Sequence, residues 1–422
     1  MISAHKYDRL LTVFKSILIL LFGIFVNVVS AQDSSIAVIN ATVYLSPQAA
    51  PLTGQTILIR ERKIEYIGPD LAAKITSSYR KINAKGKFIT AGFWNSHVHL
   101  METKWQNAVQ IAGDTLQIQI QDMLSSRGFT YAFDLASLDP SDIISINRRI
   151  LSGEVLGPTI FFVGVPVTSK SPFYIKPAVL PELKTIDEVK AHVGEQFKQG
   201  AGGIKIWTAS PTGNDIVFMP DSLIRAASAL ARSKKVPLFA HPTNIAGAKK
   251  AIRNGVTVLA HVAPDDRLPW EPSFVKEMID RKIALIPTLK LFPWDLKLGG
   301  NHNPEDPLIK TAVDQLRVFQ QAGGTVLFGT DVGYMTDYDP LVEYKLMHAA
   351  GMSPRQILAA LTINPAKKFG YQKSKGIISK GYDADLIIFD EDPMTDVDNF
   401  IKVRSVIHNG RVIYHKPPPI LQ

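Results

Sequence analysis

Residues 95–99 read Asn95-Ser96-His97-Val98-His99 and end a run of β-forming residues that begins at Phe88. Side chains two positions apart on a strand point to the same side, so this segment presents both imidazoles in one direction. Two histidines on one strand face are a common beginning of a metal site. The pair alone is weak evidence, because two hydrogen-bonded polar side chains would explain it equally well.

Four more polar residues stand at the carboxyl ends of other predicted strands. They are Lys205, His241, His261 and Asp331. In a barrel of parallel strands, the carboxyl ends meet at one mouth, and catalytic residues gather there. The sequence therefore predicts that these four residues join His97 and His99 in one metal site.

The middle of the chain alternates strands and helices. Strands are predicted at 88–97, 130–135, 159–165, 203–207, 237–240, 256–260, 283–287 and 326–329. Helical patterns between them include 187–199, 221–234, 245–254 and 307–322. Eight such units suit a (β/α)₈ barrel or a doubly wound sheet. The lack of a Gly-rich phosphate loop after the first strand disfavours a dinucleotide-binding fold.

Both ends of the chain look different, because they are rich in short strands. The C-terminal part includes a strong hairpin turn at Asn409-Gly410. We therefore predict an α/β protein, a (β/α)₈ TIM barrel over residues 89–370. Residues 32–88 and 371–422 are predicted to form one small composite β-sandwich domain.

Each candidate ligand also has a structural explanation. A lysine in an apolar strand can be a buried ion-pair partner, and a lone histidine is often a hydrogen-bonded core residue. Asp331 precedes Val332-Gly333 and could be a turn residue. These explanations would have to hold independently on consecutive strand–helix units, which favours a shared site. The remaining histidines lack this placement and are interpreted as structural or surface residues: His192, His302, His348, His408 and His415.

Composition excludes several classes of function. The chain has 422 residues, of which 46% are hydrophobic, and a formal net charge of +9. Basic residues are mixed with acidic ones and form no block, so a nucleic-acid-binding arm is not predicted. A solvated basic surface explains the net charge, and attraction of an anionic substrate or membrane surface is the alternative explanation. The absence of cysteine excludes disulfides, thiolate ligands, a cysteine nucleophile and a lipoprotein anchor.

The first 31 residues have the pattern of a signal peptide. A basic start is followed by a mostly apolar run at 17–29, which is shorter than the roughly 20 residues that span a bilayer. Val29-Ser30-Ala31 offers small residues for cleavage, which would leave Gln32 first. We expect an exported protein, periplasmic or secreted, without a stable membrane anchor. An uncleaved anchor is the alternative.

The ordered ligand set resembles the metal-dependent amidohydrolase superfamily, in particular its imidazolonepropionase-like and prolidase-like branch. The resemblance rests on His97-Val98-His99, on Lys205, His241 and His261, and on Gly329-Thr330-Asp331. The segments 361–370 and 381–386 also look like the family's closing helix and its return to the β domain. Two positions depart from the family pattern. Asn95 replaces the usual Asp, and Ala91 replaces the usual Pro, although neither position is a ligand.

The resemblance implies two divalent metal ions. Zinc suits the imidazole and carboxylate ligands, and manganese, iron and cobalt are alternatives. One ion would be held by His97, His99 and Asp331, and the other by His241 and His261. In this family the lysine at the position of Lys205 is often carboxylated, which turns a cation into a bridging anion. Asp331 would be the general base and acid.

The function predicted from this site is hydrolysis of C–N bonds in small amides, such as a dipeptide, an N-acyl amino acid or a cyclic amide. A lactonase or other ester hydrolase is the alternative enzyme. An exported zinc- or sugar-binding protein without turnover is the alternative outside enzymes. The expected partner is a small-molecule substrate, and assembly into a homo-oligomer is the alternative to a monomer.

Substrate recognition is expected in the loops, which carry most specificity in barrel enzymes. The candidates are Tyr174, Lys290 and Tyr334. The segment 290–306, which contains Trp294 and two glycines, is long enough to form a lid. The alternative explanation for all three residues is an ordinary place on a surface loop.

Overall fold

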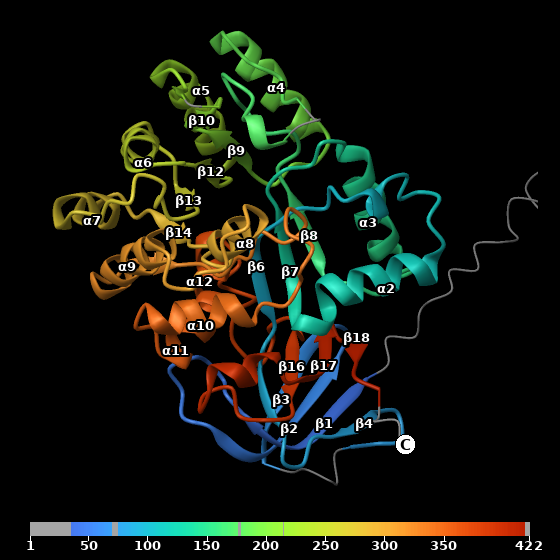
Figure 1. Cartoon of the computed structure of the whole chain (residues 1–422). Coiled ribbons are helices and arrows are strands. Elements are labelled where there is room, and N and C mark those ends of the chain that lie inside the picture. The colour runs from blue at the N-terminus through green and yellow to red at the C-terminus, as the bar shows by residue number, and fades with distance from the viewer. Residues whose placement is uncertain (1–34, 70–74, 176–178, 214, 418–422) are drawn as a thin grey trace, which may run out of the picture. The chain divides into compact units, whose positions relative to one another are not determined.

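The computed structural model describes residues 35–69, 75–175, 179–213 and 215–417 (Figure 1). The predicted signal peptide therefore lies outside the described residues. Among the described residues, no helix has the length and apolar character needed to cross a membrane.

Eight parallel strands form the middle of the chain, in two sheets. One sheet has the order β6-β7-β8 and the other β15-β14-β13-β12-β9. Their bounds are β6 Phe93–Val98, β7 Phe129–Asp134, β8 Thr159–Phe162, β9 Ile204–Trp207, β12 Leu238–His241, β13 Val258–Ala260, β14 Ala284–Ile286 and β15 Thr325–Val326. Backbone bonds join the two sheets at both edges. At one edge Ser96 N donates to Phe328 O at 2.7 Å, and at the other Val167 N donates to Lys205 O at 2.8 Å.

Helices connect these strands, as the sequence predicts. They are α2 Gly113–Met123, α3 Pro140–Ser152, α4 Ile186–Lys198, α5 Asp221–Lys234, α6 Ile245–Arg253, α7 Pro272–Asp280, α8 Leu291–Leu298, α9 Pro307–Gln321, α10 Leu341–Ala349, α11 Pro354–Leu361 and α12 Ile363–Lys368. Capping explains several boundaries. Thr185 and Glu188 form a capping box at the start of α4, and Ser353 and Gln356 form another at α11. A short hairpin, β10 Ala209–Pro211 and β11 Ile216–Phe218, follows β9.

Both ends of the chain contribute to one mixed sheet. Its order is β18-β17-β16-β5-β1-β2-β3, with β4 paired to β1. The strands are β1 Ile36–Val43, β2 Leu52–Arg60, β3 Lys63–Pro69, β4 Arg80–Asn83, β5 Phe88–Ala91, β16 Leu386–Phe389, β17 Val403–His408 and β18 Arg411–His415. The blue N-terminal and red C-terminal strands lie side by side in Figure 1. Hydrogen bonds connect all eight as a single sheet, and the predicted sandwich of two facing sheets stays a prediction.

The predicted strand 88–97 is wrong, because the structure divides it in two. β5 belongs to the mixed terminal sheet, whereas β6 begins the parallel strands. The division falls at Gly92, whose N–H donates to Asp385 O at 2.9 Å. A Cβ at residue 92 would lie 2.3 Å from Thr130 Oγ1, so only glycine allows the chain to cross here.

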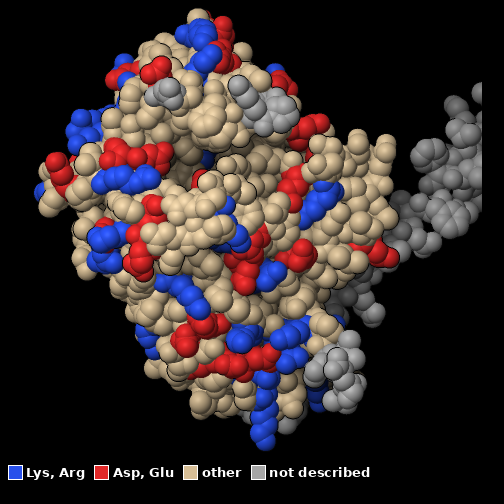
Figure 2. Space-filling model, in the orientation of Figure 1, with Lys and Arg blue, Asp and Glu red and all other residues tan. Residues whose placement is uncertain are grey.

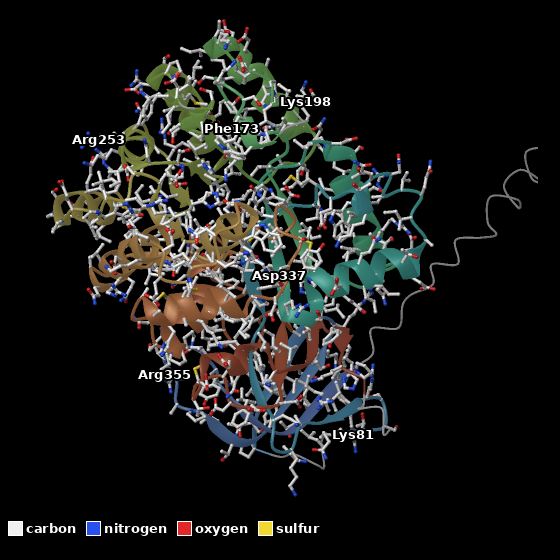
Figure 3. The ribbon with its side chains drawn as sticks, in the orientation of Figure 1. Lys81, Phe173, Lys198, Arg253, Asp337 and Arg355 are labelled. Atoms are coloured by element: carbon white, nitrogen blue, oxygen red, sulfur yellow. The ribbon has the colours of Figure 1, made fainter. Side chains whose placement is uncertain are left out.

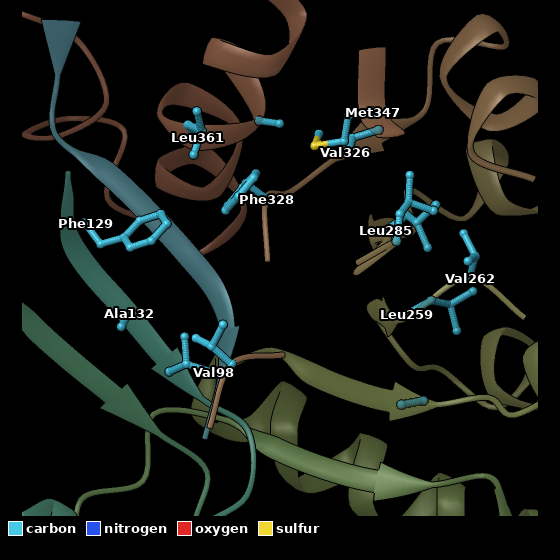
Figure 4. Packing of buried hydrophobic residues seen from close by; sticks show 14 of the residues in the cluster. Val98, Phe129, Ala132, Leu259, Val262, Leu285, Val326, Phe328, Met347 and Leu361 are labelled. Atoms are coloured by element: carbon cyan, nitrogen blue, oxygen red, sulfur yellow. The ribbon is translucent and has the colours of Figure 1, made fainter. Parts of the chain in front are cut away.

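The parallel strands are buried on both faces, and successive side chains enter different clusters. On β13 and β14, Leu259 and Leu285 pack toward the helices, in the cluster shown in Figure 4. Val258 and Ala284 belong instead to an inner cluster with Phe239. Since Lys205 pairs in register with Phe239, it lies on this inner face rather than against the helices.

On the face shown in Figure 2, Lys and Arg side chains are interspersed with Asp and Glu and form no block. This distribution agrees with the mixed charge pattern of the sequence. The absence of a nucleic-acid partner stays a prediction.

Candidate metal centre and active site

His97, His99 and Asp331 meet at the end of β6. Asp331 Oδ1 lies 3.1 Å from His97 Nε2 and 2.8 Å from His99 Nε2, and the two Nε2 atoms are 3.2 Å apart. Burial lowers the pKa of His97 to about 3. Burial by itself would raise the pKa of Asp331, but the facing imidazoles hold it well below its usual range. The site thus pairs a carboxylate with the neutral imidazole of His97.

His241 and His261 extend the same cluster. The ring of His261 lies 4.7 Å from that of His97 and 4.6 Å from that of His241, measured between centroids. Thr288 Oγ1 donates to Pro287 O at 2.9 Å, so its lone pair is left to accept from His261 Nδ1 at 2.6 Å. This contact places the imidazole proton on Nδ1 and leaves Nε2 free as a ligand. Burial lowers the pKa of both histidines.

Lys205 is a buried lysine beside the histidines, and the residue is 2% exposed. Its Nζ lies 5.3 Å from the centre of the Trp207 ring. Among the described residues it has no hydrogen-bond or ion-pair partner. Burial lowers the pKa of Lys205 to about 7, against an opposing effect of Asp331. A large part of this amine is therefore neutral near pH 7.

Close backbone packing brings Asp331 to the histidines. Asp331 N donates to His97 O at 2.9 Å, and His99 N donates to Val332 O at 2.8 Å. Gly333 has a φ of +97°, and a Cβ there would lie 1.6 Å from His99 O. Asn95 ties the two segments together, because its Nδ2 donates to Thr330 Oγ1 at 2.7 Å and its Oδ1 accepts from His97 N at 3.2 Å.

The donor set fits a divalent metal. Ligand atoms of His97, His261 and Asp331 lie within 4.8 Å of one another. Unprotonated imidazole nitrogens and a carboxylate oxygen repel one another at such separations unless a cation stands among them. The structure thus brings His97, His99, Lys205, His241, His261 and Asp331 together, as the sequence predicts; their roles as ligands belong to the proposal below.

Tyr174 also reaches this cluster. It lies in the short helix η4 Phe173–Ile175, next to Phe173, which is labelled in Figure 3. The Tyr174 hydroxyl lies 3.4 Å from His241 Nε2 and accepts from Trp207 Nε1 at 2.8 Å. Burial raises the pKa of Tyr174, so the phenol keeps its proton.

Tyr334 lies close to the site with acidic neighbours. Its hydroxyl donates to Asp295 Oδ1 at 3.4 Å. Burial, followed by the charge of Asp331, raises the pKa of Asp295 to about 6. Burial likewise raises the pKa of Asp265 to about 6. Tyr334 therefore stands where a substrate contact is expected, and that contact stays a prediction.

Lys290 has a different environment from the one expected. Its Nζ donates to Asp337 O at 2.6 Å and to Asp339 O at 2.5 Å, and Asp337 is labelled in Figure 3. The side chain thus holds the loop before α10, and a substrate contact by Lys290 has no support in this geometry. The prediction that residues 290–306 form a loop is wrong, because residues 291–298 form α8.

Sequence reasoning missed three residues that position the site. Trp207 lies two residues after Lys205 on β9, so the two-residue period of a strand could have placed both on one face. Asp134 ends β7 and accepts from Leu100 N at 2.8 Å; its place at a strand end was the available signal. Thr288 had no such signal, because it acts through a contact with His261.

The chain resembles proteins of known activity over most of its length. The model of the amidohydrolase family matches residues 88–413. Ochratoxinase from Aspergillus niger is 22% identical, covering 90% of this chain and 86% of the relative. Imidazolonepropionase from Thermoplasma volcanium is 31% identical over 26% of this chain and 30% of its own length. The crystal structure of a Xaa-Pro dipeptidase with bound methionine superposes with a TM-score of 0.77 at 20% identity, covering 91% of this chain and all of that one.

The family match covers more than half of the chain and includes every strand that carries a candidate ligand. This chain belongs to the amidohydrolase family and is a hydrolase that acts on carbon–nitrogen bonds.

Proposed function

We propose that this protein is an exported, metal-dependent hydrolase of small amides, with dipeptides and N-acyl amino acids as its substrate class. The observation that carries the proposal is the convergence of Asp331 with His97 and His99 within 3.1 Å. The name of one similar solved structure supports the substrate class, because a Xaa-Pro dipeptidase cleaves a dipeptide.

The proposed metal ligands form two sets. His97, His99 and Asp331 would hold one ion, and His241 and His261 the other, with carboxylated Lys205 between them. Divalent ions in these positions supply Lewis-acid activation of water and of the scissile carbonyl, and zinc suits the ligands best. The low pKa of buried Lys205 supports carboxylation, because only the neutral amine can bond to CO₂ and release a proton.

Asp331 is proposed to move the proton of the reaction. Its carboxylate accepts a proton from the attacking water and delivers it to the leaving nitrogen as the C–N bond breaks. The pKa of Asp331, held low by the imidazoles, keeps the acceptor form present at neutral pH. Thr288 holds His261 in the tautomer that a metal ligand needs.

A closed (β/α)₈ barrel is part of this proposal. The eight parallel strands and the backbone bonds at both edges of the two sheets support it. In such a barrel the ligands at strand ends face one mouth, which agrees with their convergence.

Turnover of a substrate panel tests the proposal. Metal-loaded protein is assayed with dipeptides, N-acyl amino acids, cyclic amides and lactones, with bicarbonate present. We expect amide cleavage, and a loss of about 10²–10⁴-fold in kcat for Asp331→Asn. Faster hydrolysis of lactones than of any amide would replace the amide substrate class with an ester class. Tight metal binding without any turnover would make the protein a metal-binding protein.

A further inference from the structure

Trp207 fixes the position of the Tyr174 hydroxyl. The indole Nε1–H donates to Tyr174 Oη at 2.8 Å. The same indole stacks on the His241 ring, with centroids 5.3 Å apart and planes inclined by 20°. Trp207 is 6% exposed, so its ring has little freedom to move. The phenol is therefore held beside the metal-site histidines by a rigid aromatic residue.

The direction of the phenolic proton follows from this bond. A tyrosine hydroxyl has one proton, and Trp207 as a donor can occupy only a lone pair of its oxygen. The proton must point elsewhere, and the acceptor that the described part of the chain offers it is His241 Nε2 at 3.4 Å, which is a long bond. A nitrogen that gives its lone pair to a metal cannot accept this proton. The hydroxyl then has a free donor directed at the site.

We propose that Tyr174 is a catalytic residue that donates a hydrogen bond to the oxygen of the scissile carbonyl, and that Trp207 positions it. The inference rests on the proposed function. When the attacking water oxygen bonds to the carbonyl carbon, the C=O electron pair moves onto oxygen, and Tyr174 stabilises this charge without losing its proton. As the pair returns, the C–N bond breaks and Asp331 delivers its proton to nitrogen.

Tyr334 offers a matched control. It is also a half-buried tyrosine at the site, but its hydroxyl donates to Asp295 Oδ1. Its proton has a carboxylate acceptor at 3.4 Å, which metal binding by the histidines would leave in place. Tyr334→Phe removes the same hydroxyl group as Tyr174→Phe without removing the proposed oxyanion contact.

The test compares four variants of the metal-loaded protein. Loss of one oxyanion donor typically lowers kcat about 10²–10³-fold, so this is expected for Tyr174→Phe, with KM within a few-fold and metal content unchanged. Trp207→Phe keeps an aromatic ring but lacks the N–H, and a smaller loss is expected. The double variant should be no slower than Tyr174→Phe, because the indole N–H acts only through Tyr174, and the phenyl ring of Trp207→Phe still packs against His241. Tyr334→Phe removes a predicted substrate contact rather than an oxyanion donor, so it should raise KM and lower kcat less than about 10-fold.

Inhibitor binding provides a second readout that does not depend on turnover. A phosphonate analogue of the tetrahedral transition state should bind Tyr174→Phe more weakly by the same factor as the loss in kcat, whereas a product amino acid should bind equally well. Equal kcat in wild type and Tyr174→Phe, or additive losses of kcat in the double variant, would overturn this inference but leave the proposed function standing. Loss of metal or of thermal stability in Tyr174→Phe would assign the residue a structural role instead. A wild-type protein that hydrolyses no carbonyl substrate overturns the proposed function, and the inference with it.

Discussion

At the scale of single residues, Lys205 has an unfavourable environment if its ammonium is unmodified. A buried charge without a partner is costly, and this one would also repel metal cations. Conversion of the ammonium to a carbamate reverses the charge and supplies two ligand oxygens. The proposed two-metal centre therefore depends on this one residue.

Replacement of Lys205 tests that dependence. Lys205→Ala should lower metal content from about two ions per chain to about one and remove most activity, since a bridging ligand is lost. Acetate or propionate should partly restore both, whereas Lys205→Arg should not be rescued, because guanidinium stays charged. Metal analysis beside activity at rising carboxylate concentration is the measurement. Lys290→Ala is the control, since that buried lysine binds carbonyls and should leave the metal count unchanged. Full activity in Lys205→Ala would leave a one-metal site.

Glu343 on α10 provides a second test at this scale. It is fully buried, Oε2 accepts from Lys290 N at 2.7 Å, and burial raises its pKa to about 8. Between its ordinary pKa and about pH 8, the folded protein holds a proton that the unfolded chain has released. Stability should therefore fall as pH rises through this window, by up to about 1.4 kcal/mol per unit. Glu343→Gln keeps an acceptor for Lys290 N but cannot ionise.

Urea unfolding of wild type and Glu343→Gln at pH 6, 7 and 8 measures the effect. As pH rises, the free energy of unfolding of Glu343→Gln should increase relative to that of wild type. The nearby charges of Lys290 and Asp331 are the same in both proteins, so they cancel in the comparison. Parallel pH profiles would show that Glu343 is ionised in the folded protein throughout this range.

At the scale of elements, the site depends on how closely the segment after β15 packs against the end of β6. The two segments leave no room for a side chain at Gly333, because a Cβ there would overlap His99 O. Backbone strain and overpacking together should make Gly333→Ala less stable by about 3 kcal/mol or more. Gly300 also has a positive φ, of +81°, but open space around it, so Gly300→Ala should lose only about 1–2 kcal/mol. Thermal unfolding and metal content are the measurements. Equal losses would mean that the left-handed conformation alone requires glycine at residue 333.

At the scale of the whole molecule, residues from both ends of the chain support the parallel strands. Tyr131 of β7 donates to Asp385 Oδ2 at 2.5 Å, and His408 Nδ1 lies 2.8 Å from Asp385 Oδ1. His408 thus has the structural role that the sequence analysis gave it. Asp385 is 7% exposed, so the shared network offsets the cost of burying its charge.

Export is the prediction that concerns the whole chain. The basic start, the short apolar run and Val29-Ser30-Ala31 predict cleavage after Ala31. N-terminal sequencing of secreted or periplasmic protein should begin at Gln32 or within a few residues of it. Exported protein that still begins near Met1 would favour the uncleaved anchor.

The sequence by itself determined the order of strands and helices and the set of candidate ligands, because both are recorded in local patterns. Hydrophobic periodicity placed α5 at Asp221–Lys234 without error, and the strand-end positions indicated six candidate ligands, of which the structure groups His97, His261 and Asp331 within 4.8 Å. Local patterns failed where a contact outweighed them. The two glycines in residues 290–306 suggested a loop, yet they come only at the end of α8, and Pro293 is tolerated in the first turn of that helix.

Only the tertiary structure decided which loop residues belong to the site. Tyr174 and Lys290 are both polar residues after a strand, and nothing in their neighbouring sequence separates them. Tyr174 meets Trp207, 33 residues away, and Lys290 meets Asp337, 47 residues away. Such partners are set by the packing of distant segments, which a local sequence pattern does not encode, because the free energy of a contact depends on what the fold brings within hydrogen-bond distance.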